Sequence, residues 1–274
     1  MACLTKKQFR LIASIAKDHW GLNITDQKYD LIKNRMAKHM NCGRFSDVDE
    51  YLDYIVECSS DAEKLELFDV LSTNVTSFFR EAHHYDYIER ELYTPLRKHA
   101  ISKPGSKIRI WSAGCSFGCE PYSMAMHADV HLGGIDNWDI EILATDLSNS
   151  ALSVAQRAVY DKSSMANIDV DMYMKYFIQK NHSDGEKYMV NDRIRKIVHL
   201  ARLNLIELWP FKGPLDIIFC RNVMIYFDKK TKTEIINRMY DMMCPGGIFA
   251  IGSSETLSGI DVPFRSAAPS LYIK

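Results

Sequence analysis

The sequence has no long hydrophobic run, since no apolar stretch reaches the roughly 20 residues that a membrane-spanning helix needs. Its N-terminal residues, MACLTKKQFR, also lack the apolar core of a secretory signal peptide. Charge of one sign is not in excess: Lys+Arg 34 and Asp+Glu 35 give a net charge of -1, so whole-chain charge does not argue for nucleic-acid binding. We therefore expect a cytoplasmic protein that neither inserts into a membrane nor binds nucleic acid.

The sequence also lacks a recognisable metal-binding motif. Its seven cysteines are scattered, and the one close pair, Cys115 and Cys119, matches no common zinc spacing. We expect reduced thiols that pack as small apolar side chains, and no metal site. The seven are Cys3, Cys42, Cys58, Cys115, Cys119, Cys220 and Cys244.

The composition itself is that of an ordinary globular protein. The hydrophobic fraction is 47%, and 274 residues suffice for one large domain or two modest ones. Apolar residues recur at helical spacing up to about residue 70, which predicts an all-helical N-terminal part. The predicted inward residues are Phe9, Ile12, Ile15 and Ala16 in the first helix, Leu31, Ile32 and Met36 in the second, Leu52, Ile55 and Val56 in the third, and Leu65 and Phe68 in the fourth.

The second of these helices carries a cluster of basic side chains. The cluster is either a solvated face or a docking surface for an acidic partner, and the charge pattern alone leaves both open. The predicted N-cap of this helix is Thr25 or Asp26. The basic residues are Lys28, Lys33, Arg35, Lys38 and His39.

The stretch KIRIWSAGCSFGCEPYSMA, residues 107–125, organises the rest of the chain. Ile108 and Ile110 predict a short buried strand, Gly114 a sharp turn, and Pro121 the first turn of a helix. A strand, a glycine turn and a helix form the first unit of an open α/β sheet, in which ligands bind at the carboxyl ends of the strands.

The ligand indicated by this turn is not a dinucleotide. Gly114 and Gly118 do not follow the G-x-G-x-x-G spacing, and Glu120 at the helix start would repel a phosphate. S-adenosylmethionine (SAM), which has hydroxyls and positive charge but no phosphate, fits better; the alternative is a tight turn with no ligand. A second strand ends in Asp146, which suits ribose hydroxyls, although it could instead cap the next helix, as Ser148 also can.

The α/β pattern is lost between Tyr160 and Lys196, where a hairpin with a polar turn at Lys180–Glu186 is expected. It resumes with strands over residues 198–203, 215–220 and 248–251 and a helix over 229–243 that stops at residues 244–247, and Phe264 and residues 271–273 would supply the last edge strands.

The hydroxyl-rich segment from residue 72 to 81 predicts an irregular link. We expect Ser77 to cap the helix that follows, and Phe78 and Phe79 to enter the core. That helix should cover residues 81–93, with a new turn at Thr94-Pro95.

Five motifs in this order resemble the chemotaxis receptor methyltransferase family of the CheR type. The resemblance implies SAM-dependent methylation of glutamate side chains on the cytoplasmic domain of membrane chemoreceptors. It also implies a SAM-methyltransferase-type doubly wound α/β sheet (107–274) with a small β insertion (about 163–196), an N-terminal helical domain (1–72) and a linker with a connecting helix (73–106). The motifs are TNVTSFFRE, WSAGCSFGCEPYSMA, ATD, LNL and IIFCRNVMIYFD.

The resemblance implies a set of site residues as well. Arg80 and Tyr226 would form the catalytic pair, with Tyr226 near the transferred methyl group. In the family a second acid usually stands where this chain has Cys119. The implied cofactor-binding residues are Asn74, Thr76, Arg80, Gly114, Glu120, Asp146, Asn204, Leu205, Arg221 and Asn222.

Many family members hold the receptor's C-terminal tail with a glycine-rich loop of a three-stranded insertion. The matching turn here, Lys180–Glu186, contains only Gly185. The chemistry needs no general base, because a glutamate carboxylate is ionised at neutral pH. The two-donor fork of Arg80 suits such a carboxylate, and Tyr226 can donate to its other lone pair. The alternatives are methylation of another acidic protein or a small molecule, or a non-catalytic SAM-binding scaffold.

Overall fold

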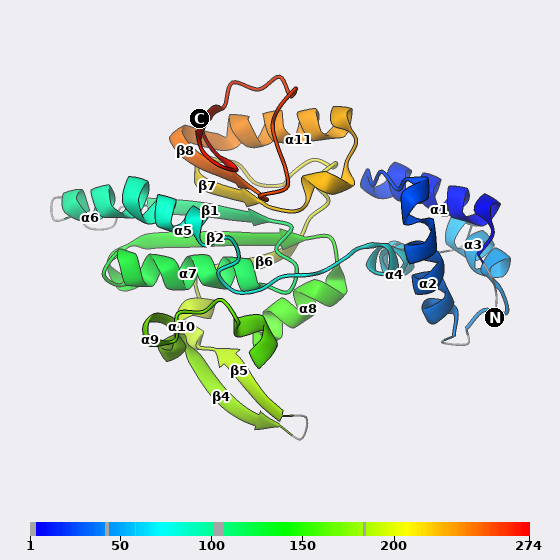
Figure 1. Ribbon diagram of the computed structural model, residues 1–274, viewed down its shortest axis with the longest axis horizontal. Helices are drawn as coiled ribbons and strands as arrows, with labels where there is room; N and C mark the ends of the chain where they lie inside the picture. Colours follow the sequence, from blue (N-terminus) through cyan, green and yellow to red (C-terminus); the bar gives the residue numbers. More distant parts are fainter. Residues whose placement is uncertain (1–3, 42–43, 58, 101–106, 183–184) are drawn as a thin grey trace.

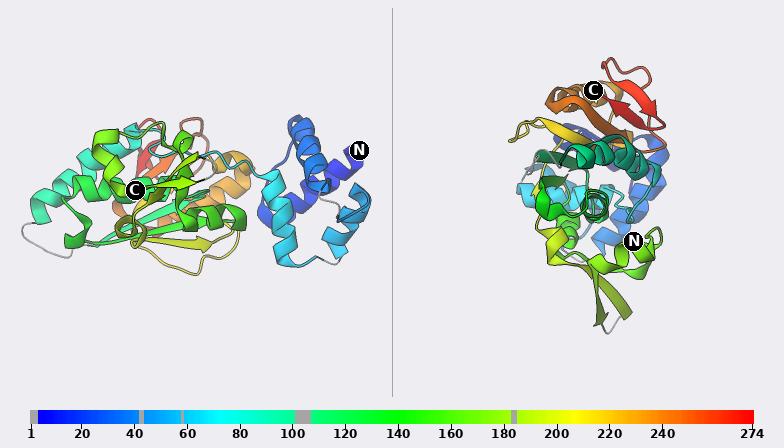
Figure 2. Two further views of the ribbon diagram at one scale, coloured as in Figure 1. Left: turned by 90° about the horizontal axis from the view of Figure 1, so that it is seen from below. Right: turned by 90° about the vertical axis from the view of Figure 1, so that its left-hand side faces the viewer.

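The computed structural model describes residues 4–41, 44–57, 59–100, 107–182 and 185–274. A helical N-terminal part lies at one end of the elongated molecule, beside an α/β part (Figures 1 and 2). None of the described helices is long and apolar enough to cross a membrane. The N-terminal helices are α1 (Lys6–Trp20), α2 (Tyr29–Met40), α3 (Val48–Glu57) and α4 (Asp61–Leu71).

Local capping explains where these helices begin and end. The side chains of Thr5 and Gln8 form a capping box at the start of α1, and Gly21 ends it in the left-handed conformation. Ser60 and Glu63 form the same box on α4. A 3-10 turn (Asp26–Lys28) precedes α2, and the predicted cap Thr25 stands at the N-cap position of this turn without a side-chain capping hydrogen bond.

The predicted buried stripes hold apart from two residues. Leu31 is 46% exposed and Val56 is 56% exposed, whereas Ile32 and Ile55 beside them are buried. Adjacent helical residues point about 100° apart, and Leu31 and Val56 lie outside the buried stripes to which Ile32 and Ile55 belong.

The linker is irregular, as predicted, but the helix after it differs from the prediction. It begins at α5 (His83–Ile88), passes through a π turn (Glu89–Tyr93) and continues as α6 (Thr94–Ala100), and Ser77 does not cap it. The predicted break at Thr94-Pro95 is wrong, because the π turn changes the bonding pattern just before the proline and the helix runs on. The predicted loop at residues 103–105 lies outside the described residues.

In the described part of the α/β region, seven strands form one sheet in the order β6-β2-β1-β7-β8-β10-β9. The strands from β6 to β8 are parallel, and the order reverses at β1, which is where a crevice opens in such sheets. The bounds are β1 (Lys107–Ala113), β2 (Asp139–Asp146), β6 (Val198–Arg202), β7 (Leu215–Cys220), β8 (Met243–Ile251), β9 (Arg265–Ala268) and β10 (Leu271–Ile273).

Both faces of the sheet are covered, which confirms the predicted doubly wound α/β class. Ile217 and Phe219 of β7 pack on one side with α5 and α7 (Cys119–His131). Ile218 and Cys220 pack on the other side with α11 (Lys229–Met242) and with residues of the N-terminal helices, so the two parts of the chain share one core. The remaining helix beside the sheet is α8 (Asn149–Arg157).

The C-terminal strands differ from the predicted boundaries. Strand β8 starts directly at Met243, so residues 244–247 lie inside it and do not form a loop. Strand β10 pairs on both sides and β9 is the edge, while Phe264 precedes β9 and stacks on Phe249.

The insertion is a three-stranded antiparallel sheet, β3-β5-β4, and not the hairpin that its residues alone predicted. The third strand, β3 (Val159–Asp161), comes from before the predicted insertion and pairs with β5 (Gly185–Val190). Residues 183–184 of the predicted turn are outside the described residues. The other elements here are β4 (Phe177–His182), α9 (Val170–Tyr173) and α10 (Asp192–Arg195).

Candidate active site

A cleft of about 370 Å³ opens at the carboxyl ends of β1, β2 and β7 and is closed on one side by the linker. It gathers segments that lie far apart in the sequence, as the crossing of the linker over the sheet edge in Figure 1 shows. Of the predicted site residues, ten line it: Asn74, Thr76, Arg80, Gly114, Glu120, Asp146, Leu205, Arg221, Asn222 and Tyr226.

Asn204 is the predicted site residue that does not line the cleft. Its buried amide donates to the carbonyl oxygen of His19 and to Glu207, both at 2.9 Å. Leu203 and Leu205 on either side of it do line the cleft. Asn204 therefore ties the loop after β6 to the end of α1.

The turn after β1 is as sharp as the sequence suggests. Gly114 has φ 82, and a Cβ there would lie 2.3 Å from Val223 Cγ2. Gly118 has φ 87, and a Cβ there would lie 2.8 Å from the Cβ of Ala155. A side chain at either position would clash and adopt a strained conformation, so both glycines are required for the turn to pack.

Asp146 ends β2 inside the cleft. Its two carboxylate oxygens accept the amide protons of Ser116 (2.8 Å) and Ser148 (2.9 Å). Burial raises the pKa of Asp146 above its usual value, and these backbone hydrogen bonds oppose the rise. The N-cap of α8 is Ser148, as its hydroxyl accepts from the amide of Ala151, so Asp146 keeps free lone pairs toward the cleft.

Arg221 is a buried cation held between two carboxylates. Its guanidinium lies 3.2 Å from Glu81 and 3.3 Å from Glu120. Glu120 also accepts a hydrogen bond of 2.7 Å from the hydroxyl of Ser112. Burial raises the pKa of Glu120, and the charge of Arg221 works against that rise. Arg221 is thus neutralised by the protein itself.

Arg80 has a different environment at the same cleft. Its guanidinium donates to the carbonyl oxygen of Val75 at 3.1 Å, and no carboxylate of the described residues lies within ion-pair distance of it. Tyr226 also lines the cleft, donates to the carbonyl oxygen of Thr73 at 3.3 Å, and has its pKa raised by burial. The ammonium of Lys28 lies 5.1 Å from the centre of the Tyr226 ring.

The basic cluster of α2 is largely engaged within the protein. Arg35 donates to the carbonyl oxygens of Val70, Leu71 and Ser72 and to the hydroxyl of Thr73, so it fastens the end of α4 to the linker. Arg35 is thus not simply part of a solvated face, and docking of an acidic partner by the basic cluster stays a prediction.

Two acidic residues of the site were missed by the sequence analysis. Glu81 stands inside the motif TNVTSFFRE but was given no role, and its other oxygen accepts from the amide of Ser253. Glu255 lies in the loop after β8 and accepts from the amides of Asn222 (2.8 Å), Gly252 (2.7 Å) and Ile225 (3.1 Å). It holds the left-handed turn at Asn222, and no sequence pattern indicated it.

Two family models match the chain: "CheR methyltransferase, all-alpha domain" over residues 7–72, and "CheR methyltransferase, SAM binding domain" over residues 74–272. The chemotaxis protein methyltransferase of Borreliella burgdorferi is 34% identical over 258 residues, which cover 93% of this chain and 90% of that protein. A probable chemotaxis protein methyltransferase of Rhizobium etli is 35% identical over 239 residues (87% and 88%).

The chemotaxis protein methyltransferase of Escherichia coli is 31% identical over 271 residues, covering 98% of this chain and 91% of that protein. The two matched regions cover the helical part and the α/β part of the chain. The residues that line the cleft belong almost entirely to the matched SAM-binding region. This chain belongs to the CheR methyltransferase family, and its α/β part is a SAM-binding methyltransferase domain.

Proposed function

We propose that the protein transfers the methyl group of SAM to glutamate side chains of chemoreceptor cytoplasmic domains and so forms glutamyl methyl esters. The observation that carries this proposal is the contrast between the two arginines of the cleft. Arg221 is neutralised by Glu81 and Glu120, whereas Arg80 has only a neutral carbonyl partner among the described residues. A guanidinium at the cleft with no carboxylate of the described residues within ion-pair distance is suited to an anionic substrate, and a carboxylate matches its two-donor fork.

The cleft suits SAM by its charge and by its hydrogen-bonding groups. The carboxylates of Glu120 and Asp146 line it, and they match a ligand with a positive charge and hydroxyl groups. The hydroxyl of Ser116 is buried in the same lining and has no hydrogen-bond partner in the described part of the chain, so a polar ligand would satisfy it. When bound, SAM supplies an electrophilic methyl group.

The chain's own residues then have positioning roles. Asp146 accepts from ribose hydroxyls, and Glu120 holds the methionine portion. Asn74, Thr76, Leu205 and Asn222 line the remaining walls. Arg80 orients the substrate carboxylate, and the hydroxyl of Tyr226 donates to its other lone pair. Since the nucleophile is already an anion, neither residue has to take a proton.

The test is the transfer of tritium from methyl-labelled SAM to receptor-containing membranes, followed by mild base. The proposal requires labelled protein that releases labelled methanol, because a methyl ester is base-labile and a methylamine is not. Base-stable label would indicate methylation of a group other than a carboxylate. Label found only on another acidic protein or on a small molecule would indicate a SAM-dependent methyltransferase with that other substrate. Tight SAM binding without any transfer would indicate a non-catalytic scaffold.

The insertion is a second proposed contact with the receptor, through its C-terminal tail. The support is an edge strand, β4, that has β5 on one side only and carries a half-exposed Ile178. We expect deletion of the receptor tail to raise the KM for receptor membranes and leave kcat unchanged. An unchanged KM would exclude the proposed contact with the tail, and it would not affect the proposal that receptor glutamates are methylated.

A further inference from the structure

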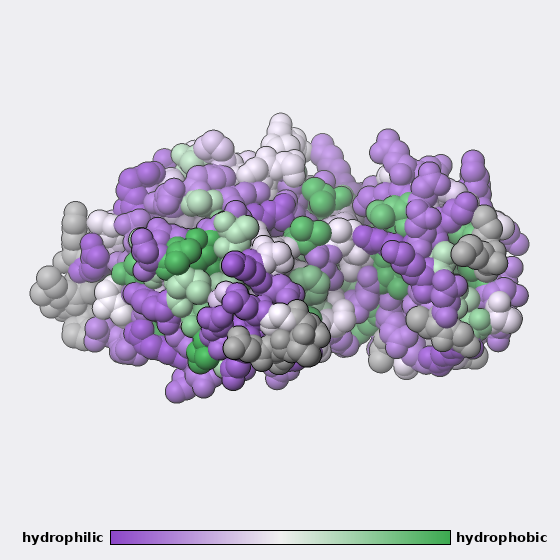
Figure 3. Space-filling view, turned by 60° about the horizontal axis from the view of Figure 1, so that its bottom comes forward, coloured by the Kyte–Doolittle hydropathy of each residue, from purple (hydrophilic) through white to green (hydrophobic). Residues whose placement is uncertain are grey.

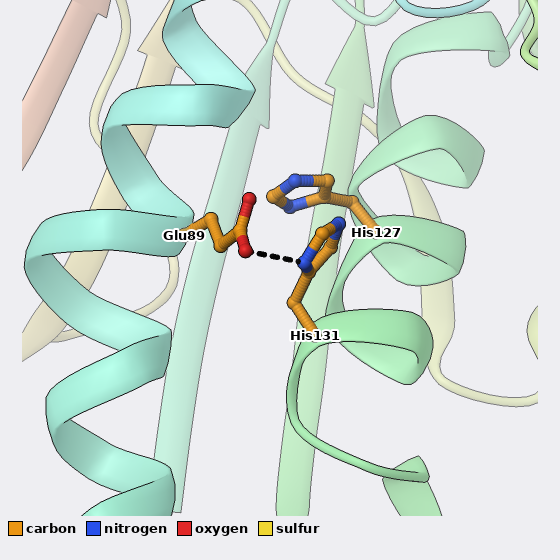
Figure 4. Close-up of side chains that lie close together, drawn as sticks. All are labelled: Glu89, His127 and His131. Carbon is orange, nitrogen blue, oxygen red and sulfur yellow. Dashed lines mark ion pairs between the residues drawn. The ribbon is translucent and has the colours of Figure 1, made fainter.

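A second cluster of titratable side chains lies outside the cleft, between the π turn and α7 (Figure 4). Glu89 opens the π turn, and His127 and His131 lie one helical turn apart on α7 with their rings toward Glu89. One ligand atom of each residue lies within 4.8 Å of the other two. Among the described residues, no other group of three His, Cys, Asp or Glu side chains meets in this way.

These three side chains make up a recognised donor set. Two imidazoles and one carboxylate bind zinc in tetrahedral sites that keep one position open. Zinc ligands lie about 2 Å from the metal, so donor atoms of such a site are roughly 3.3 Å apart. Nδ1 of His131 is already 3.0 Å from Oε1 of Glu89. A donor nitrogen of His127 lies within 4.8 Å of both of these residues, so the three donor atoms would have to close by about 1.5 Å at most to surround one zinc ion.

The surroundings of His127 distinguish the cluster from an ordinary surface ion pair. His127 is 3% exposed, and its ring has aromatic contacts with the rings of Tyr85 and Tyr93. Its ring centre lies 4.2 Å from that of His131. A buried imidazole therefore lies beside the His131–Glu89 pair.

We propose that Glu89, His127 and His131 bind one divalent transition-metal ion of the zinc type, with water in the open position. The metal would fasten the connecting helix to the carboxyl end of α7. His131 is about 16 Å along the helix from Glu120, at the rise per residue of an α-helix. The ion therefore serves stability and takes no part in methyl transfer, and the proposal is independent of the proposed substrate.

The test is titration of the metal-free full-length protein with zinc and with cobalt in a chelating buffer. We expect one equivalent of zinc to bind and to raise the melting temperature. Bound cobalt should show visible d–d absorption without the near-ultraviolet band of cobalt–thiolate bonds, which separates this site from cysteine binding. Glu89→Gln, which keeps the size of the side chain, and His131→Asn should each weaken zinc binding tenfold or more.

The exposed pair of His199 and Glu141 provides a matched control, because it is a histidine–glutamate pair without a second histidine. Glu141→Gln should leave the zinc affinity unchanged. Unfolding curves in chelator show whether each variant is folded before its affinity is compared. Equal zinc affinity in the wild type and folded Glu89→Gln, a thiolate-type cobalt spectrum, or no zinc binding by the wild type would each overturn the proposal.

Discussion

The guanidinium of Arg221 donates a hydrogen bond of 2.6 Å to the main-chain carbonyl oxygen of Arg80. Arg221 thus fixes the backbone of Arg80, the second arginine of the cleft. Glu81, the residue after Arg80, has φ 58 and accepts a hydrogen bond from the side chain of Arg221. Left-handed backbone at a residue other than glycine persists only where the surrounding contacts hold it. The backbone at Arg80 is therefore held by a residue that comes 141 positions later in the chain.

Loss of the Arg80 guanidinium should mainly slow turnover. We expect Arg80→Ala to lower kcat by roughly a hundredfold, which is the scale of losing a positioning group. The kcat of Arg80→Lys should lie between those of the wild type and Arg80→Ala, because lysine keeps the positive charge but not the two parallel N–H donors of a guanidinium. Arg90→Ala, at an exposed arginine outside the cleft, is the control for loss of a positive charge. Single-turnover rates with receptor membranes decide this, and a normal rate for Arg80→Ala would exclude the role.

The carboxylate of Asp146 should contribute to cofactor affinity. Asp146→Ala would leave two ribose hydroxyls without their acceptor, which costs roughly 1–3 kcal/mol, or about tenfold or more in affinity. Calorimetric titration with S-adenosylhomocysteine measures the loss. Asp192→Ala, at an exposed aspartate of α10, is the control. Undiminished affinity in the Asp146 variant would remove this residue from the ribose site.

The pH dependence of the rate tests the role of Tyr226. Burial raises the pKa of Tyr226, so its phenol stays protonated at neutral pH and can donate a hydrogen bond but cannot serve as a base. The substrate carboxylate is ionised from about pH 5 upward, so the single-turnover rate should stay level between about pH 6 and 9. Tyr226→Phe should cost on the order of tenfold at every pH. A rate that climbs tenfold per pH unit in the wild type and not in the variant would indicate a tyrosinate base.

Arg35 should support the fold and not receptor docking. Arg35→Met removes the hydrogen bonds to the end of α4 and should lower the free energy of unfolding by roughly 1–3 kcal/mol. Lys38→Met, at an exposed position on the same helix, should change it little. Denaturant titration of both variants gives the comparison. Equal stability of the two would mean that the carbonyls reached by Arg35 are equally well satisfied by water.

Acid should destabilise the protein through His84. Burial, with the charges of Arg221 and His83, lowers the pKa of His84 to about 3, and Glu81 and Ser270 are its other polar neighbours. Between about pH 6.5 and 3 the unfolded chain therefore binds a proton that the folded chain does not, so stability is lost as the pH falls, by up to about 1.4 kcal/mol per unit.

His84→Gln removes this titration while its amide can still bond to Ser270. Denaturant unfolding at about pH 7 and about pH 5 should show a smaller acid loss in the variant than in the wild type. The same loss in both proteins would assign the acid sensitivity to other groups.

The residues alone determined the order of the elements, the glycine turn and the family. These features are local: a strand period, the glycine turn after residue 113, or a motif such as residues 217–228 is complete within a few residues. A short segment therefore carries the whole signal, and it does not depend on what packs against it.

The tertiary structure alone decided which similar residues differ in role. Arg80 and Arg221 are both arginines within motifs of the family, yet only Arg221 forms ion pairs with Glu81 and Glu120 in the described part of the chain. Asn204 turns toward His19 and leaves the cleft to its neighbours, and Arg35 binds the end of α4. The partners of these charged and polar groups come from distant parts of the chain, and a charge takes its role from the partners that folding brings within a few ångströms of it.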